Sequence, residues 1–382
     1  MAKSSTGSRQ GVNTSSLNKR ILYRFLHENG PSSRQAILMG TGLSLPTITQ
    51  GLNTLSKLGL VGVAESIRNT GGRNAISYTC LPDARFAIGL FFSVHHITAV
   101  AVDILGNIRC EKRIRRKADL HDESYLKALA GLADEVLRES GLPDEALIGV
   151  GISVQSLVSE DGEYFEHGMT QDFTGITRST FAKYMPWPVR IFHDAGAAGF
   201  AEVWSRPDMN TAFYLSLNDV VGGAFIINGR TLFSGDHFRA GEIGHILIDP
   251  RYGELCYCGK RGCFDTVCRS TVLDSLCGGN LDEFFRLLDE GHEEAGKRFD
   301  TYLTHLAIAI HNIRMLLDCP VIVGGYVGSL MERHMNELCR RVDEYMIFGS
   351  PANSYVFPCR FRREAMAAGA AIEMLDDFIE SL

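Results

Sequence analysis

Three cysteines and a histidine lie within 19 residues of one another, and this cluster constrains the fold more than any other feature of the sequence. Its members are His245, Cys256, Cys258 and Cys263, and the histidine ends a Gly-Glu-Ile-Gly-His run. Thiolates and a neutral imidazole are ligands that tetrahedral Zn²⁺ prefers, and closed sites with four protein ligands are usually structural. Glycines between the ligands let the chain turn tightly around an ion. The pattern predicts a structural Zn²⁺ site, with Cys268 as a substitute ligand outside the tight cluster.

The alternative is a set of free buried thiols beside a packing histidine. That interpretation suits isolated cysteines better than a cluster. Ten cysteines in 382 residues are few for a disulfide framework, and a Cys256–Cys258 bridge would be strained. Residues 1–11 lack the apolar core of a secretory signal, and no apolar run reaches the roughly 18 residues of a membrane span. We therefore expect a soluble, reduced, cytoplasmic protein with no membrane segment.

Charge is distributed unevenly along the chain. The first 80 residues carry nine Lys or Arg and two Glu, a net charge of +7, so the remaining 302 must carry −14 to give the total of −7. A hydrophobic content of 45% excludes a disordered chain, and the length suggests two or three domains. A basic N-terminal segment on an acidic remainder suggests an anionic partner for that segment alone, although charge by itself fits an accident of composition equally well.

Within the basic segment, the apolar spacing predicts three short helices followed by two strands. The expected helices are about Ser16–Asn29, Arg34–Gly40 and Ser44–Leu58, and the expected strands are Leu60–Ala64 and Ala75–Thr79. A basic tip over residues 65–74 joins the strands. This order is that of a helix-turn-helix followed by a wing, and the alternative is a small helical interaction module.

The third helix carries apolar residues on one face and short polar side chains off it. Ile48, Leu52, Leu55 and Leu58 form the apolar face. Hydroxyl and amide side chains on the exposed face suit base edges in a major groove, and arginines in the wing suit phosphates or a minor groove. The expected DNA-contacting residues are Arg34, Ser44, Thr47, Thr49, Gln50, Asn53, Arg68 and Arg73.

The rest of the chain alternates strands with helices, which predicts a layered α/β domain. The expected strands are 87–93, 97–102, one near Ile108, 147–154, 211–217, 223–227 and 321–323. The expected helices are 123–140, 295–318 and 363–381, the last with small residues at 367–371 that allow close packing.

Taken together, these motifs resemble the ROK family, named for repressors, open reading frames and kinases. The resemblance runs from about Ser16 to Ile379 and is carried by Ser33-Arg34, Thr41–Ser44, Gly71–Arg73, His193–Ala195, Glu202, Asn228-Gly229, Gly241–His245, the cysteine cluster and Gly324-Gly325. It implies a winged helix-turn-helix over 1–80 and a two-lobed, actin-like, sugar-kinase-like α/β body over 81–382. Lobe one would comprise about 81–192 and the C-terminal helix 363–382, and lobe two about 193–362. The fused winged helix resembles the repressor branch, because the family's sugar kinases usually lack it.

By this resemblance, the family's Zn²⁺ ligands map onto His245, Cys256, Cys258 and Cys263, and its sugar-contacting residues map onto Asp194, Glu242 and His245. Carboxylates suit this task because one carboxylate can accept two sugar hydroxyls. Taken alone, each polar residue could be a surface or capping group, and Asp194 could cap a helix over 195–204 while also serving the pocket. Tyr164, Gln171 and Asp172 are further candidates for the pocket lining.

The family's kinases carry an Asp-x-Gly-Gly-Thr phosphate loop near the start of the body. The matching residues here are Phe91, Phe92, Ser93, Val94 and His95, which have neither the aspartate, the glycine pair nor the threonine. Backbone N–H groups must approach ATP phosphates closely, and side chains would block them. We therefore expect no catalytic residues, and Asp194, which matches the family's catalytic base, is expected to hold a sugar hydroxyl.

We predict a transcriptional regulator, a repressor of carbohydrate uptake or metabolism genes, that binds double-stranded operator DNA. A sugar or sugar phosphate in the cleft would control it, and a homodimer or homotetramer would place winged helices on two half-sites. Three alternatives remain: an ATP-dependent sugar kinase with an accessory DNA-binding head, a regulator controlled by a protein partner, and a scaffold whose body is a protein-interaction domain that does not respond to sugar. The apolar Phe91 and Phe92, where ligand phosphates would lie, are compatible with the scaffold, but apolar residues in a strand are usually packed.

Overall fold

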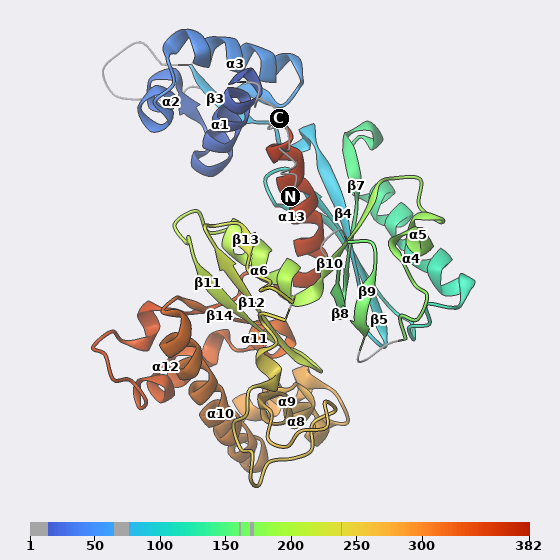
Figure 1. Ribbon diagram of the computed structural model, residues 1–382, viewed down its shortest axis with the longest axis vertical. Helices are drawn as coiled ribbons and strands as arrows, with labels where there is room; N and C mark the ends of the chain where they lie inside the picture. The colour runs from blue at the N-terminus through green and yellow to red at the C-terminus, as the bar shows by residue number, and fades with distance from the viewer. Residues whose placement is uncertain (1–13, 65–75, 160–161, 169–171, 238) are drawn as a thin grey trace, which may run out of the picture.

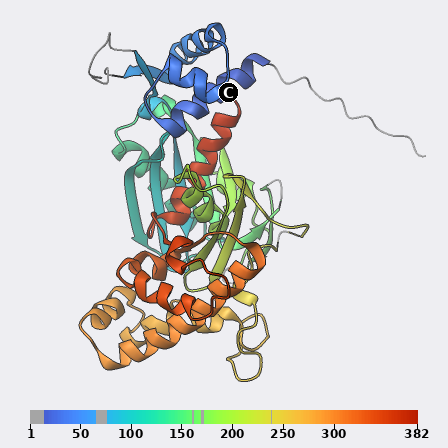
Figure 2. The same ribbon diagram turned by 90° about the vertical axis from the view of Figure 1, so that its left-hand side faces the viewer.

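The chain forms a small N-terminal head and a larger body of two lobes, with the head at one end of the molecule (Figures 1 and 2). This computed structural model describes residues 14–64, 76–159, 162–168, 172–237 and 239–382. Arg68, Arg73 and Gln171 lie outside the described residues, as do the expected wing tip and the first 13 residues. Among the described helices, none combines the length and the apolar character needed to cross a bilayer.

Three helices and a three-stranded antiparallel sheet make up the head. Their bounds are α1 (Thr14–Asn29), β1 (Ser32–Ser33), α2 (Arg34–Thr41), α3 (Leu45–Lys57), β2 (Val61–Ala64) and β3 (Ser77–Cys80). The sheet order is β1-β3-β2. This is the element order of a winged helix-turn-helix, so the three predicted helices and two predicted strands are confirmed to within two residues where both ends are described.

Serine caps start the two helices of the helix-turn-helix. The Ser33 hydroxyl accepts a hydrogen bond from the Ala36 N–H at 3.2 Å, and the Ser44 hydroxyl accepts one from the Thr47 N–H at 3.4 Å. Such caps satisfy N–H groups that lack partners in the first turn. They explain why the expected helix starts were close to the observed ones.

The apolar face of α3 packs against α1. Gly51 lets the two helices approach closely, because a Cβ there would displace the end of the Leu22 side chain of α1. Ile48, Leu52 and Leu55 are buried, but Leu58 is 48% exposed. The expectation that Leu58 shares the buried face was therefore wrong: α3 ends at Lys57, and the chain turns away at Leu58 and Gly59.

Lobe one contains a five-stranded sheet in the order β10-β7-β4-β5-β6. Strands β10, β7 and β4 run parallel, whereas β5 and β6 pair antiparallel. The bounds are β4 (Phe86–Phe92), β5 (His96–Asp103), β6 (Ile108–Arg115), α4 (Glu123–Glu139), β7 (Leu147–Val154), β8 (Ser156–Val158), β9 (Phe165–Gly168), α5 (Arg178–Ala182) and β10 (Val189–His193). Strand β10 was not predicted, yet it delivers the chain to the first residue of the candidate sugar site.

Lobe two contains a second five-stranded sheet, in the order β13-β12-β11-β14-β15. The bounds are α6 (Asp194–Trp204), β11 (Ala212–Leu217), β12 (Val221–Ile227), β13 (Thr231–Leu232), α7 (Phe264–Cys268), α8 (Thr271–Asp274), α9 (Leu281–Asp289), α10 (Glu293–Leu317), β14 (Val321–Gly324), α11 (Gly325–Leu330), α12 (Met335–Asp343) and β15 (Val356–Pro358). The expected long helix is thus confirmed as α10.

The C-terminal helix α13 (Ala365–Glu380) joins all three parts of the molecule. It packs against α6 and against β4 and β7 of lobe one, and its end reaches α1 of the head (Figures 1 and 2). Close packing requires small residues, as predicted: a Cβ at Gly369 would collide with the Ala197 carbonyl of α6, and one at Gly89 with the Ala367 carbonyl.

The head rests directly on the body rather than hanging from a free linker. Buried side chains of α1 and α3 belong to the same hydrophobic cluster as those of α6 and α13. Arg24 of α1 pairs with Asp376 and, at 2.6 Å, with Glu380. The His27 ring lies 4.6 Å from the Trp204 ring, and Trp204 Nε1 donates to Asp376 at 3.1 Å. These contacts fix the head to the ends of α6 and α13.

Candidate functional site

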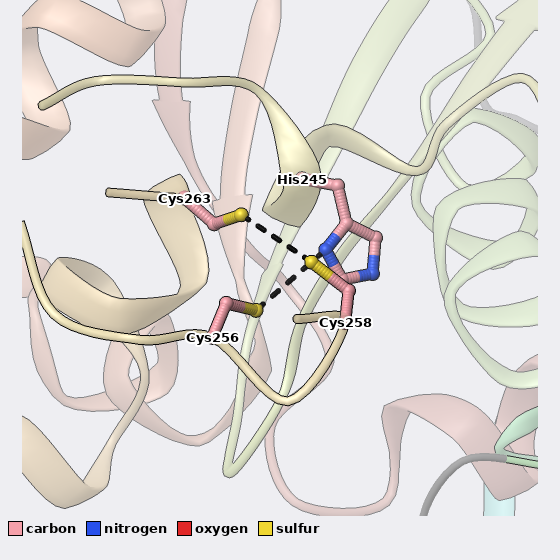
Figure 3. Close-up of side chains that lie close together, drawn as sticks. All are labelled: His245, Cys256, Cys258 and Cys263. Carbon is pink, nitrogen blue, oxygen red and sulfur yellow. Dashed lines mark hydrogen bonds between the residues drawn. The ribbon is translucent and has the colours of Figure 1, made fainter. Parts of the chain in front are cut away.

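The four residues of the predicted metal site meet at one point of lobe two (Figure 3). One ligand atom from each of His245, Cys256, Cys258 and Cys263 lies within 4.8 Å of the others. Cys256 Sγ is 3.8 Å from His245 Nδ1, and Cys258 Sγ is 3.6 Å from Cys263 Sγ. The side chains come from three short segments that converge before α7.

Tight turns bring these segments together. The Cys256 N–H donates to the Lys260 carbonyl at 2.8 Å, and the Gly259 N–H donates back to Cys256 at 2.9 Å. Gly262 has a φ of +72°, and a Cβ there would collide with the Asp249 carbonyl. Only glycine tolerates both the positive φ and this close approach.

The donor set fits Zn²⁺. A tetrahedral ion with Zn–S bonds of about 2.3 Å holds its sulfur ligands roughly 3.8 Å apart, close to the separations observed here. His245 turns Nδ1 to the thiols, while its Nε2 lies 3.1 Å from the Tyr257 hydroxyl. An outer partner of this kind fixes the orientation of a ligating imidazole. Cys268 is not a substitute ligand, because its Sγ is buried against the Tyr302 carbonyl.

The residues expected to bind sugar line one cavity between the lobes. Asp194, Glu242 and His245 all face this cavity, whose volume is about 320 Å³. Asp194 is the first residue of α6, whereas Glu242 and His245 flank the short turn that leads to the cysteine cluster. The cavity lies at the low end of the roughly 300–1,000 Å³ that is typical of small-molecule sites. The structure therefore brings together three residues that are up to 51 positions apart.

Asp194 does not cap α6, contrary to the alternative raised from the sequence. His193 is the cap, and its Nδ1 accepts a hydrogen bond from the Gly196 N–H at 3.3 Å. Asp194 Oδ1 accepts from the adjacent Ala195 N–H at 2.7 Å. Burial raises the pKa of Asp194, and Glu242 adds to this rise, while His193 opposes it. A carboxyl group that has lost water in this way gains strongly from ligand hydroxyls.

Some cavity residues were missed from the sequence. Ser216, Arg239 and Tyr257 line the cavity, and they come from strand β11 and two loops. Asp265 is fully buried nearby, with Oδ1 accepting from the Val221 N–H at 2.8 Å. Its signal in the sequence was a carboxylate two residues after the last cysteine of the cluster. Tyr164 and Asp172, considered earlier, are exposed and are absent from this cavity's lining.

The segment that replaces the kinase phosphate loop is packed with side chains. Phe91 and Phe92 end β4 and are buried, which confirms the core interpretation of both residues. Across the lobes, Tyr326 of α11 lies under the Arg113 guanidinium, 5.5 Å from ring centroid to Cζ. Burial raises the pKa of Tyr326, and Arg113 and the Ser93 hydroxyl oppose this rise. An aromatic side chain thus bridges the lobes beside Ser93.

The head presents polar side chains on α3, away from the body. Gln50 and Asn53 are exposed, as is Ser44, while Thr47 and Thr49 are half-buried. A shallow depression over this helix is lined by Leu45, Pro46, Thr49, Gln50, Asn53, Thr54 and Lys57. Arg34 is held in place, because its guanidinium donates to the Tyr78 hydroxyl at 2.6 Å.

A winged helix-turn-helix on a two-lobed α/β body, with a Cys₃His cluster beside the cleft, defines a class of protein. In that class, a head with the fold of a DNA-binding domain is fused to a sugar-kinase-like body. Residues 87–376 match the ROK family, and the chain belongs to it.

Relatives in this family include both regulators and kinases. The xylose repressor of Bacillus subtilis is 24% identical over 381 residues, which cover 96% of this chain and 97% of the repressor. The transcriptional regulator NagC of Escherichia coli is 26% identical over 268 residues, covering 68% of this chain and 64% of NagC. An N-acetylmannosamine kinase of Escherichia coli is 29% identical over 217 residues, which cover 55% of this chain and 69% of the kinase.

Solved structures share the fold. A ROK transcriptional regulator, described as a homologue of the Escherichia coli Mlc protein, superposes with a TM-score of 0.72 at 20% identity and covers 97% of this chain and 98% of its own. A ROK hexokinase from Thermus thermophilus gives a TM-score of 0.61 at 22% identity, over 77% of this chain and 99% of its own. The regulator thus matches nearly the whole chain, head included, whereas the hexokinase matches about three quarters of it.

Proposed function

We propose that this chain is a transcriptional repressor of carbohydrate uptake or metabolism genes that binds operator DNA through its head and a sugar through its cleft. One observation carries the proposal: Asp194, Glu242 and His245 line one cavity, and the helix that begins at Asp194 ends at Trp204 against the winged helix. The full-length similarity to a protein named xylose repressor supports it.

The head would bind DNA through α3. Gln50 and Asn53 would contact base edges in the major groove, with Ser44, Thr47 and Thr49 nearby. Lys57, Arg68 and Arg73 would contact phosphates. Arg34 would contact DNA only from the position in which its hydrogen bond to the Tyr78 hydroxyl holds it. A homodimer, or a homotetramer of two such dimers, would place two heads on half-sites about one helical turn apart.

The cysteine cluster would hold a structural Zn²⁺ through His245, Cys256, Cys258 and Cys263. An ion there supplies rigidity, since all four positions are taken by protein ligands. It would keep the Glu242–His245 turn in place, so that both side chains face the cavity. Sugar binding would thus depend on the metal without any contact to it.

A kinase activity is disfavoured. Buried Phe91 and Phe92 lie in the segment that matches the phosphate loop of the family's kinases, and the Tyr326 ring bridges the lobes beside it. This segment therefore has no glycine-rich backbone that ATP phosphates could approach. We expect no ADP release from ATP with any sugar in a coupled assay. Sugar-dependent turnover that Asp194→Asn abolishes would support the kinase alternative instead.

The decisive experiment begins with a randomised duplex library, from which the purified full-length protein selects its own site. Fluorescence anisotropy then measures the affinity for that duplex with and without xylose, glucose, N-acetylglucosamine, their phosphates and their disaccharides. At least one sugar should change the affinity by 5-fold or more, the scale of ordinary coupling between sites. Selection of no sequence would overturn DNA recognition, while selection without any sugar effect would favour control by a protein partner.

A further inference from the structure

A second cavity lies next to the one that contains Asp194. Its volume is about 400 Å³, and it spans from lobe one to the β13 region of lobe two. The two cavities share Leu157, His193 and Glu242 as lining residues. A ligand held in the first cavity would therefore lie against residues of the second.

One wall of the second cavity is a flat aromatic surface. Phe233 lines it and is 47% exposed, so its ring is accessible to a ligand in the cavity. Two contacts hold Phe233 in place. Its ring stands edge-on to the Phe225 ring, with 6.0 Å between the ring centroids, and its backbone N–H donates to the Phe225 carbonyl at 2.8 Å. A rigid aromatic face of this kind suits the apolar C–H face of a sugar ring.

The polar groups of the cavity do not favour an anion. Arg178 pairs with Glu163 at 2.6 Å, and Arg190 pairs with Asp377, so both arginines are already neutralised. Glu242 and Glu373 add two carboxyl groups to the lining. A phosphate would meet the Glu242 carboxyl group, and among the described residues that line the cavity both arginines already have carboxylate partners.

The same groups suit neutral hydroxyls. Arg178 lines the cavity with a side chain that is 42% exposed, so its planar guanidinium offers N–H donors to a ligand. Burial raises the pKa of Glu373 to about 8, with Arg190 opposing the rise, so this carboxyl group can both donate and accept near neutral pH. A planar donor, a carboxyl group and an aromatic face together match a hydroxylated ring.

We propose that the second cavity binds a second sugar ring, so that the effector is a neutral disaccharide or glycoside rather than a monosaccharide or a sugar phosphate. The first ring would occupy the Asp194 cavity, and the second would pack on Phe233. This inference rests on the proposed function, because it assumes that the first cavity binds sugar.

Isothermal titration of the full-length protein tests the inference. The probes are matched pairs: xylose with xylobiose, glucose with cellobiose and with maltose, and N-acetylglucosamine with diacetylchitobiose, together with glucose 6-phosphate. One disaccharide should bind at least 10-fold more tightly than its own monosaccharide. Phe233→Ala should remove that advantage while leaving monosaccharide affinity unchanged, and Phe233→Trp should keep it.

The matched control is Phe348→Ala, which removes another exposed aromatic side chain of lobe two that lines neither cavity. It should leave both affinities unchanged. A monosaccharide or glucose 6-phosphate that binds as tightly as every disaccharide would overturn the inference and leave the proposed function standing. Binding of no sugar at all would overturn both, and an advantage that survives Phe233→Ala would overturn the assignment of the second cavity.

Discussion

The head and the cleft present their polar side chains in opposite ways. Gln50 and Asn53 stand exposed on a helix surface, whereas Asp194 is only 9% exposed and Ser216 is buried between the lobes. Exposed polar groups contribute little interaction free energy while water surrounds them, and contacts between charged side chains and DNA weaken as salt rises. Buried groups have already lost their water, so each depends on a specific partner. We therefore expect substitutions in the head to cause graded losses and substitutions in the cleft to cause larger ones.

Helix α6 joins the two regions. It begins at Asp194 in the cleft and ends at Trp204 against His27 of the head, ten positions or about 15 Å apart. Both ends are fixed by packing, since α13 lies along the helix and the head shares its hydrophobic cluster. A small movement at the cleft would thus reach the head as a rigid displacement.

Removing a cysteine ligand should have the largest effect. Cys258→Ser would take one ligand from the proposed zinc site, and structural zinc contributes about 10–16 kcal/mol of binding free energy in zinc-finger peptides. We expect loss of zinc by elemental analysis, a lower unfolding temperature and no sugar response. Cys277→Ser, a half-buried cysteine outside the cluster, serves as the control and should keep the zinc. Protein purified with reductant and without chelator that holds no zinc would contradict the metal assignment.

Asp194→Asn should come next. It keeps the shape but removes a charged acceptor, and hydrogen bonds to charged groups contribute about 1.5–3 kcal/mol, so sugar affinity should fall roughly 10- to 150-fold. DNA affinity without sugar should not change. Isothermal titration measures the first quantity and anisotropy the second, with exposed Asp208→Asn as the matched control. Unchanged sugar affinity would exclude Asp194 from the binding site.

Gln50→Ala should weaken specific DNA binding by about 1–3 kcal/mol, the usual cost of losing one base contact. Sugar affinity should be unaffected, which distinguishes the head from the cleft. Ser56→Ala changes an exposed residue of the same helix outside the α3 depression and should have no effect. If both variants weaken binding to specific and random duplexes alike, α3 does not read the sequence.

Trp204→Phe tests the connection between the regions. It removes the hydrogen bond to Asp376 while keeping an aromatic ring beside His27. The affinity for sugar alone and the affinity for DNA alone should both be retained. The change in DNA affinity that sugar causes should shrink by about 0.5–2 kcal/mol. Trp187 is the other tryptophan of the chain, so Trp187→Phe is the control. Undiminished coupling in Trp204→Phe would show that the signal takes another route.

Local signals in the sequence predicted the parts of the fold that depend on neighbouring residues. Ser33 and Ser44 marked the helix starts through caps that span three positions, and the spacing of the cysteines marked their convergence. Charge counting was less reliable. Arg20 and Arg24 contributed to the basic head, but the structure pairs both with carboxylates of α13, more than 350 positions away.

The cleft was harder to predict because its residues come from distant segments. The family resemblance supplied Asp194 and Glu242, but no local pattern indicates that Phe233 and Glu373 line one cavity. The capping assignment at Asp194 was wrong for a similar reason. The unpredicted strand β10 ends at His193, which places the histidine at the cap and moves the aspartate into the first turn.

Glu373→Gln should have the smallest effect, on the pH dependence of stability. The pKa of Glu373 is about 8 in the folded protein because of burial, against about 4.3 in an unfolded chain. Asp376 also raises it, Arg190 opposes the rise while paired with Asp377, and His193 lines the same cavity. Between these two values the unfolded chain releases a proton that the folded protein retains, so this group lowers the free energy of unfolding as pH rises from about 4.3 to 8.

The glutamine variant lacks this contribution and should therefore gain stability over the parent progressively across that interval, with a constant difference above it. The gain should be modest, because Arg190 and water in the cavity stabilise the charged form. Urea unfolding at pH 5, 7 and 9 measures the difference, with the exposed substitution Glu290→Gln as the control. A difference that stays flat from pH 5 to 9 would mean that Glu373 is solvated like a surface carboxylate, and it would also remove the neutral donor that the second cavity offers to a sugar hydroxyl.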